Sequence, residues 1–184
     1  MPVYTPEKIE FGQACPDFNL PAVDGKSYGL KDFKNQRPLL VLFICNHCPY
    51  VKAIEDRLIT LGDDLHKLTI NMVAICSNDE ISYPEDNFIN LKKRAEEKKY
   101  PFVYLHDQAQ TVAQTFGAIC TPDFFLYDSA TKLAYRGRLD DSWKDDKQVK
   151  TRELYDAAFE LAQNKKISRP QIPSMGCSIK WIKS

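Results

Sequence analysis

The segment Phe43–Lys52, with the sequence FICNHCPYVK, holds the residue types best suited to chemistry. Cys45 and Cys48 are separated by two residues, His47 lies between them, and Pro49 follows the second cysteine. Cysteines at this spacing are typical of a thiol–disulfide redox pair or of half a metal site. A third alternative is one reactive thiol with an incidental neighbour.

Cys48 is placed to become a reactive thiol. Proline is favoured at the first helical position, so Pro49 makes Cys48 the expected N-cap of a helix. A helix N-terminus carries positive partial charge and free N–H groups, and a thiolate at Cys48 would accept a hydrogen bond from Val51. Such placement lowers a cysteine pKa from about 8.5 to roughly 3.5–7.5. A protonated His47 would lower it further.

Cys45 lies at the end of an apolar run upstream of this helix, where the helix dipole has little effect. We therefore predict that Cys48 is the nucleophile and that Cys45 is at most its resolving partner. A disulfide between them forms only if the loop folds back. The alternative is that both are buried apolar cysteines, which suits Cys45 better than Cys48.

A metal site is not favoured by the remaining cysteines and histidines. Structural zinc sites have four ligands, commonly supplied as two pairs. The chain has one Cys-x-x-Cys, while Cys76, Cys120 and Cys177 occur singly and the other two histidines are isolated. We expect no metal and no other cofactor.

The composition is that of a soluble globular protein whose 184 residues suit one domain. The 25 basic and 25 acidic residues cancel, which gives no reason to expect nucleic acid or a membrane as partner. The longest apolar run, 39–45, is too short to span a bilayer. The N-terminus MPVYTPEKIE lacks the pattern of a secretory signal, so we expect a cytoplasmic protein with reduced cysteines.

Apolar runs rich in branched residues alternate with helical patterns along the chain. The helix that starts near Pro49 shows apolar residues at steps of three and four, namely Val51, Ile54, Leu58, Leu61, Leu65 and Leu68. Strands are predicted over 37–45, 70–77, 102–107, 123–128 and 132–138. Further helices are predicted over 84–99, 108–117 and 150–166.

Strands that alternate with helices imply a layered α/β sheet, and the turn at 128–131 makes the last two strands antiparallel. A pair of short strands turning at Asp24–Gly25 precedes them. We therefore predict an α/β fold, a three-layer α/β/α sandwich with a mixed sheet and an N-terminal β-ribbon. Residues 1–166 are expected to form the domain and residues 167–184 a C-terminal tail.

Thr121-Pro122 stands directly before a predicted strand, where either a cis or a trans bond could occur. The preceding β-α-β-α order, with a cysteine at its first helix, favours the cis form. This loop would face Cys48, which makes Cys120 a candidate resolving thiol, although a small packed residue is an equal alternative. Cys177 could fold back to Cys48 from the tail, but an inert thiol is the default there.

The order of strand, cysteine at a helix start and Thr-Pro before an antiparallel strand pair resembles the thioredoxin fold. Phe43, Cys48 and Lys52 align with the phenylalanine, the first cysteine and the lysine of the thioredoxin active-site pattern. In that register the second cysteine of the family falls on Val51, so the pair present here is shifted upstream. The resemblance implies that Pro122 and the preceding carbonyl of Thr121 hold a substrate strand.

The segments CPDFNLPAVDGKSYGLKDF, HCPYVKAIEDRL, CTPDFFLYD, YRGRLDD and GCSIKW are together similar to the alkyl hydroperoxide reductase/thiol-specific antioxidant (peroxiredoxin) family. That resemblance spans about 11–181. It implies a threonine three residues before the peroxidatic cysteine, but this chain has Cys45 there. It also implies a catalytic arginine, for which Arg138 or Arg136 is the match.

The predicted function is that of a thiol–disulfide oxidoreductase with Cys48 as nucleophile. The alternatives are a peroxiredoxin-like thiol peroxidase, a non-catalytic binding protein with a thioredoxin fold, and a zinc-binding module. The expected substrates are protein or small-molecule disulfides or peroxides, and the expected electron donor is a reducing thiol system. A homodimer is one option for the assembly.

Overall fold

The computed structural model describes residues 2–33 and 36–183. Its central sheet has five strands in the order β6-β5-β4-β8-β9. These strands are β4 (Leu39–Phe43), β5 (Asn71–Cys76), β6 (Val103–His106), β8 (Asp123–Tyr127) and β9 (Leu133–Tyr135). β4, β5 and β6 run parallel, while β8 and β9 are antiparallel to their neighbours. The predicted mixed sheet and its antiparallel closing pair are confirmed.

β4 lies in the middle of the sheet. All five of its side chains are buried, as expected for a strand that is covered on both faces. Successive side chains point to opposite faces. Leu40 and Leu42 join one hydrophobic cluster, and Leu39, Val41 and Phe43 join the other. The strand therefore links two cores, one on each side of the sheet.

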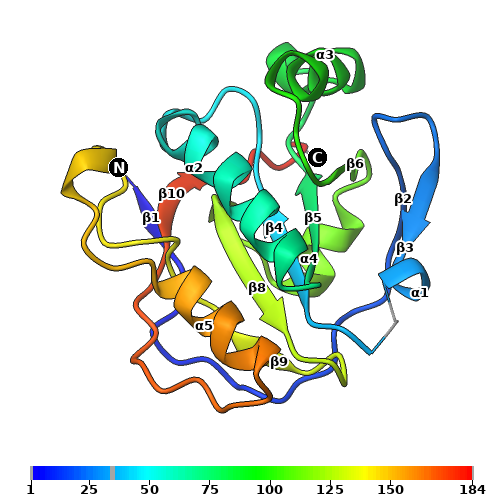
Figure 1. The fold of residues 1–184 in the computed structure, drawn as a ribbon. Helices are drawn as coiled ribbons and strands as arrows, with labels where there is room; N and C mark the ends of the chain where they lie inside the picture. Colours follow the sequence, from blue (N-terminus) through cyan, green and yellow to red (C-terminus); the bar gives the residue numbers. More distant parts are fainter. Residues whose placement is uncertain (1, 34–35, 184) are drawn as a thin grey trace.

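Helices cover both faces and complete the three layers, with α2 and α5 lying across the same side of the sheet in Figure 1. On α2 the buried residues include Val51, Ile54, Leu58, Leu61 and Leu65, which are five of the six predicted stripe residues. α4 contributes Val112 and Phe116 to the opposite core. The helices are α1 (Leu30–Phe33), α2 (Pro49–Lys67), α3 (Phe88–Lys98), α4 (Thr111–Phe116) and α5 (Glu153–Ala162).

The helix predicted from Pro84 begins later than expected. Residues Pro84–Asp86 form a separate 3₁₀ turn, and α3 starts at Phe88. Asn87 caps α3, because its side chain accepts a hydrogen bond of 2.9 Å from the N–H of Asn90. A second 3₁₀ turn, Asp146–Gln148, precedes α5.

Two smaller sheets flank the sandwich. β2 (Asn19–Pro21) and β3 (Ser27–Gly29) form the predicted N-terminal ribbon. The other sheet has the order β1-β10-β7, with β1 (Val3–Tyr4), β10 (Met175–Ser178) and β7 (Cys120–Thr121). Figure 1 shows β10, in red, beside β1, in dark blue. Residues 175–178 of the predicted tail are therefore a strand that joins both ends of the chain to the site region.

Among the helices of residues 2–33 and 36–183, none combines the length and the hydrophobicity needed to cross a membrane.

Candidate active site

Cys48 occupies the predicted position at the start of α2, with Pro49 as the first helical residue. Its side chain is completely buried, and its Sγ donates a hydrogen bond of 3.1 Å to the carbonyl oxygen of Thr121. The Thr121-Pro122 peptide is cis, as the sequence context favours. In the thiol form Cys48 makes no capping hydrogen bond to its own helix, because its S–H points to Thr121.

Two further thiols reach the sulfur of Cys48. Cys45, just beyond the end of β4, and Cys177, on β10, each hydrogen-bond to it. Cys45 Sγ also lies 3.5 Å from Thr121 Oγ1 and 3.7 Å from His47 Nδ1. All six cysteines lie in the described part of the chain, and each is present there as a thiol and not in a disulfide. Cys48 is thus the centre of a cluster of three thiols.

The surroundings of Cys48 favour its thiolate. The hydrogen bond from the Cys45 thiol is the largest effect, and burial opposes it. The side chain of Thr121 and the backbone N–H groups of Val51 and Cys177 add to the lowering and bring the pKa of Cys48 to about 4. The same hydrogen bond, together with burial, raises the pKa of Cys45 well above its ordinary value. The first proton lost by this pair therefore comes from Cys48.

His47 is held by a carboxylate that the sequence did not single out. Its Nδ1 lies 2.5 Å from Oδ2 of Asp86, which is fully buried in the 3₁₀ turn before α3. Asp86 raises the pKa of His47 through this hydrogen bond, although burial opposes the shift. The ring of His47 also stacks on Tyr83, with the ring centroids 4.9 Å apart. Asp86 was missed because the sequence places it on a predicted helix, with no sign that it turns inward.

Cys45, His47 and Asp86 are also the described residues whose donor atoms come close enough to suggest a metal, within 4.8 Å of one another. Ligands around a tetrahedral zinc ion lie farther apart than the 2.5 Å between His47 Nδ1 and Asp86 Oδ2, because each metal–ligand bond is about 2 Å or longer. These two groups are instead hydrogen-bonded directly to each other. The expectation that no metal binds stays a prediction.

β10 is fitted closely against the cis peptide. Cys177 is paired with Thr121 in antiparallel register, and Ser174 Oγ donates a 2.9 Å hydrogen bond to the carbonyl of Pro122. A Cβ added at Gly176 would lie 2.1 Å from the Thr121 oxygen, so only glycine allows this approach. The neighbouring tail residues thus form part of the wall around Cys48.

Two other predicted site residues, Cys120 and Arg138, bind partners other than Cys48. Cys120 is fully buried, and its Sγ donates to the carbonyl of Pro122 at 3.5 Å. Burial raises the pKa of Cys120. The guanidinium of Arg138 donates hydrogen bonds to the carboxylate of Glu153. Roles for Cys120 and Arg138 stay predictions.

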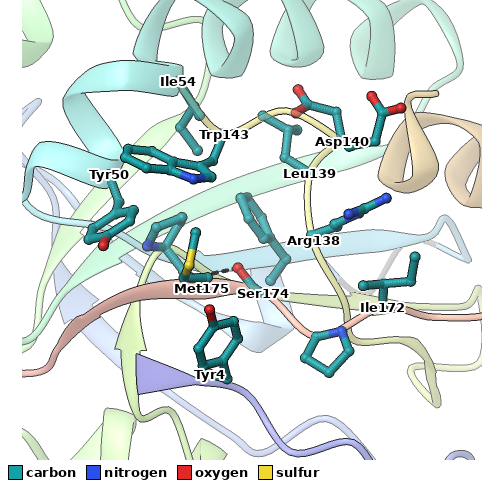
Figure 2. Close-up of a pocket in the computed structure, with 14 residues that line it drawn as sticks. Tyr4, Tyr50, Ile54, Arg138, Leu139, Asp140, Trp143, Ile172, Ser174 and Met175 are labelled. Carbon is teal, nitrogen blue, oxygen red and sulfur yellow. Dashed lines mark hydrogen bonds between the residues drawn. The ribbon is translucent and has the colours of Figure 1, made fainter. Parts of the chain in front are cut away.

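An apolar pocket of about 200 Å³ opens beside Pro122 (Figure 2). Tyr50 and Trp143 stand on one side of it, with ring centroids 4.5 Å apart, and Met175 lies near them. Arg138, Asp140 and Asp141 supply its charged lining. Because Pro122 and Met175 adjoin Thr121 and Gly176, the pocket lies next to the segments that cover Cys48. No sequence pattern marks this pocket, because its lining residues come from segments that lie far apart in the chain.

Cys48 lies at a helix start with a lowered pKa, a second thiol hydrogen-bonds to it, and a cis-proline loop packs beside it. This arrangement is that of a thiol-based redox protein with a thioredoxin-like fold. Residues 11–136 match the model described as the AhpC/TSA family. Since this match covers more than half of the chain, the chain belongs to that family. The resemblance drawn from the sequence is confirmed.

Two solved structures resemble this chain over almost its whole length. An uncharacterized conserved protein from Geobacillus kaustophilus is 40% identical, with a TM-score of 0.93, and the match covers 100% of this chain and 98% of that one. A hypothetical protein from Sinorhizobium meliloti 1021 is 37% identical, with a TM-score of 0.91 and coverage of 96% and 97%.

More distant relatives carry functional names. The thiol-disulfide oxidoreductase ResA from Bacillus cereus (strain ATCC 10987 / NRS 248) is 26% identical over 133 residues, which are 69% of each chain. The peroxidoxin BcpB from Mycobacterium tuberculosis is 18% identical, with a TM-score of 0.59 and coverage of 85% and 96%. The second likeness shows the common fold alone.

Proposed function

We propose that this protein is a thiol–disulfide oxidoreductase in which Cys48 is the nucleophile and Cys45 resolves the mixed disulfide. The observation that carries the proposal is the environment of the Cys48 sulfur, whose pKa is lowered by the Cys45 thiol, Thr121 and two backbone N–H groups. A thiolate is the attacking species in thiol–disulfide exchange. A non-catalytic binding protein would have no use for this arrangement.

In the first step the Cys48 thiolate attacks one sulfur of a substrate disulfide. A Cys48–substrate disulfide forms, and the other substrate sulfur leaves as a thiolate that takes a proton from water. Cys45 then loses its proton and attacks Cys48, which forms the Cys45–Cys48 disulfide and releases the second substrate thiolate. The substrate disulfide is reduced and the protein dithiol is oxidised, so an external thiol system must reduce the protein again.

The pocket beside Pro122 supports an apolar group on the substrate. Its lining combines Tyr50, Trp143 and Met175 with the Pro122 ring. A substrate side chain held there would lie beside the cis peptide whose Thr121 carbonyl contacts Cys48. We expect disulfides that carry an apolar or aromatic substituent to react faster than small polar ones.

Peroxide reduction is the second candidate, and membership of the AhpC/TSA family is the observation that favours it. The Cys48 thiolate would attack the peroxide to give a sulfenic acid and an alcohol or water, and Cys45 would then form the disulfide and release water. Cys45 occupies the position where a threonine would hydrogen-bond the peroxide, so we expect this reaction to be the slower one.

Rapid-reaction kinetics of the reduced protein with a small aromatic disulfide and with hydrogen peroxide test both candidates. We expect Cys48→Ser to slow the disulfide reaction by at least about a hundredfold, because a serine hydroxyl does not ionise near neutral pH. Cys45→Ser should keep the first attack and prolong the mixed disulfide. Wild-type rates in Cys48→Ser would refute the nucleophile, and a peroxide step faster than the disulfide step would favour the peroxidase.

A further inference from the structure

The three thiols that meet at Cys48 differ in their exposure. Cys48 and Cys45 are buried, with exposed fractions of 0% and 1%. Cys177 is half-buried and therefore offers the route from this cluster to solvent. A disulfide between Cys45 and Cys48 would be closed to a protein-sized reductant in this conformation.

Cys177 is held against Cys48 by both its backbone and its side chain. Its N–H and its thiol each hydrogen-bond to the Cys48 sulfur. The register of β10 with β7 places it opposite Thr121, and the close approach at Gly176 keeps the strand in place. The position of the thiol is thus set by a strand and not by a loose chain end.

We propose that Cys177 is a third redox thiol, an inference that rests on the proposed function. Cys177 would react with the buried Cys45–Cys48 disulfide to form a Cys48–Cys177 disulfide that is closer to solvent. The partner is a reducing thiol protein that attacks Cys177 from solvent.

The exchange balances in electrons and protons. The Cys177 thiolate attacks Cys48, a Cys48–Cys177 bond forms, and Cys45 leaves as a thiolate that takes up the proton lost by Cys177. A reductant thiolate then attacks Cys177, and Cys48 leaves as its stable thiolate. A second reductant thiol attacks the mixed disulfide and frees Cys177, so two external thiols are oxidised to one disulfide.

The chemistry of Cys177 changes with the state of Cys48. Burial and the neighbouring Cys48 raise the pKa of Cys177 to about 11 in the reduced protein. When Cys48 is part of a disulfide it carries no negative charge, and one of these two causes is removed. Lys180 lowers the pKa of Cys177 and remains in place. Cys177 is therefore easier to ionise when its attack is needed.

Cys120 is the competing third thiol, and the structure favours Cys177 over it. Cys120 is fully buried, and its S–H is bound to the Pro122 carbonyl. By contrast, the thiols of Cys45 and Cys177 both hydrogen-bond to the Cys48 sulfur.

Disulfide mapping of the full-length protein gives the first test. The oxidised wild type, Cys45→Ser and Cys177→Ser proteins are quenched with acid, alkylated and mapped by mass spectrometry. We expect a Cys48–Cys177 disulfide in Cys45→Ser and a Cys45–Cys48 disulfide in Cys177→Ser. If Cys45→Ser forms no Cys48–Cys177 disulfide, Cys177 is not a redox partner of Cys48.

The second test compares reduction of the oxidised proteins by a thioredoxin and by dithiothreitol. We expect Cys177→Ser to be reduced by thioredoxin at least about tenfold more slowly than wild type, with a smaller effect on dithiothreitol, which needs less space. Ser178→Ala, the next residue on β10 with an exposed side chain, is the matched control and should behave as wild type.

The outcomes separate this inference from the proposed function. If Cys177→Ser forms the Cys45–Cys48 disulfide and is reduced at the wild-type rate, the inference fails and the proposed function stands. If Cys177→Ser and Cys177→Ala both keep a native circular dichroism spectrum but form no Cys45–Cys48 disulfide, the resolving role of Cys45 fails. The mapping of Cys45→Ser then still decides whether Cys177 pairs with Cys48.

Discussion

At the scale of residues, the chemistry of this protein depends on which sulfur holds the negative charge. Cys45 and Cys48 share one hydrogen bond, and the same bond lowers the pKa of Cys48 and raises that of Cys45. The start of α2 makes the two cysteines unequal, because the N–H of Val51 hydrogen-bonds to the Cys48 sulfur and lowers its pKa. Cys45 therefore first stabilises the Cys48 thiolate through its hydrogen bond, and only later acts as a reactant itself.

The Cys45→Ala variant tests this coupling. It removes the S–H donor that makes the largest contribution to lowering the pKa of Cys48, so we expect this pKa to rise from its value of about 4. The measurement is the ultraviolet absorbance of the thiolate followed against pH. Cys15→Ala is the control, because Cys15 belongs to the hydrophobic cluster on the other face of the sheet. An unchanged titration in Cys45→Ala would show that the other partners of Cys48 stabilise the thiolate without the Cys45 thiol.

The His47–Asp86 pair gives a pH prediction with a definite sign. Asp86 raises the pKa of His47 above the usual 6.5, so His47 stays charged to higher pH in the folded protein. This contribution to stability is fully present below pH about 6.5 and is lost as the pH rises through the raised pKa. We expect Asp86→Asn to lower the pKa of His47, as measured by NMR titration of the imidazole.

Glu85→Gln is the matched control for that titration. Glu85 is the neighbouring acidic residue, and its exposed carboxylate lies 3.4 Å from Lys52 Nζ. Its loss should leave the His47 titration unchanged. If Asp86→Asn titrates as wild type does, the short contact between His47 and Asp86 does not carry the charge interaction.

At the scale of elements, strands and helices with a clear hydrophobic period could be predicted from the sequence. Prediction failed where a single residue ends one element and begins the next. The apolar stripe on α2 and the apolar run of β4 could be predicted because buried positions recur regularly along them. The inward position of Asp86 could not be predicted, because Asn87 both ends the 3₁₀ turn and caps the start of α3. β10 was missed for a similar reason. Its four residues, MGCS, have too little periodicity to mark a strand, and its partners lie far away in sequence.

Gly176→Ala tests whether β10 closes the site. The new Cβ would lie 2.1 Å from the Thr121 oxygen, so the strand must move away from the cis peptide. Because Cys177 leaves Cys48 with the strand, we expect faster alkylation of Cys48 in the reduced protein and a lower melting temperature. The measurements are mass-spectrometric alkylation rates at Cys48 and thermal unfolding. Ser178→Ala is again the control, and an equal Cys48 alkylation rate in Gly176→Ala and wild type would show that β10 does not cover the thiol.

At the scale of the whole molecule, the two ends of the chain meet at the candidate site. Thr5 and Ser174 exchange hydrogen bonds of 2.9 Å and 2.8 Å, and β10 pairs with β1 on one side and β7 on the other. Ile179 is buried in the hydrophobic cluster that contains Phe116, on the α4 side of the sheet. The domain boundary predicted between residues 166 and 167 would separate β10, Ser174 and Ile179 from the residues that they contact.

Deletion of residues 167–184 tests that predicted boundary. The truncated chain loses β10 and Ile179, and burying one such aliphatic side chain contributes about 1.5–3 kcal/mol. Native domains are stable by only about 5–15 kcal/mol, and β1 and β7 would also lose their shared partner, so we expect a marginally stable protein. The measurement is the midpoint of urea unfolding compared with that of full-length Cys177→Ser, which keeps the strand but lacks the thiol. Equal midpoints would mean that the last eighteen residues are a separable tail, as the sequence suggests.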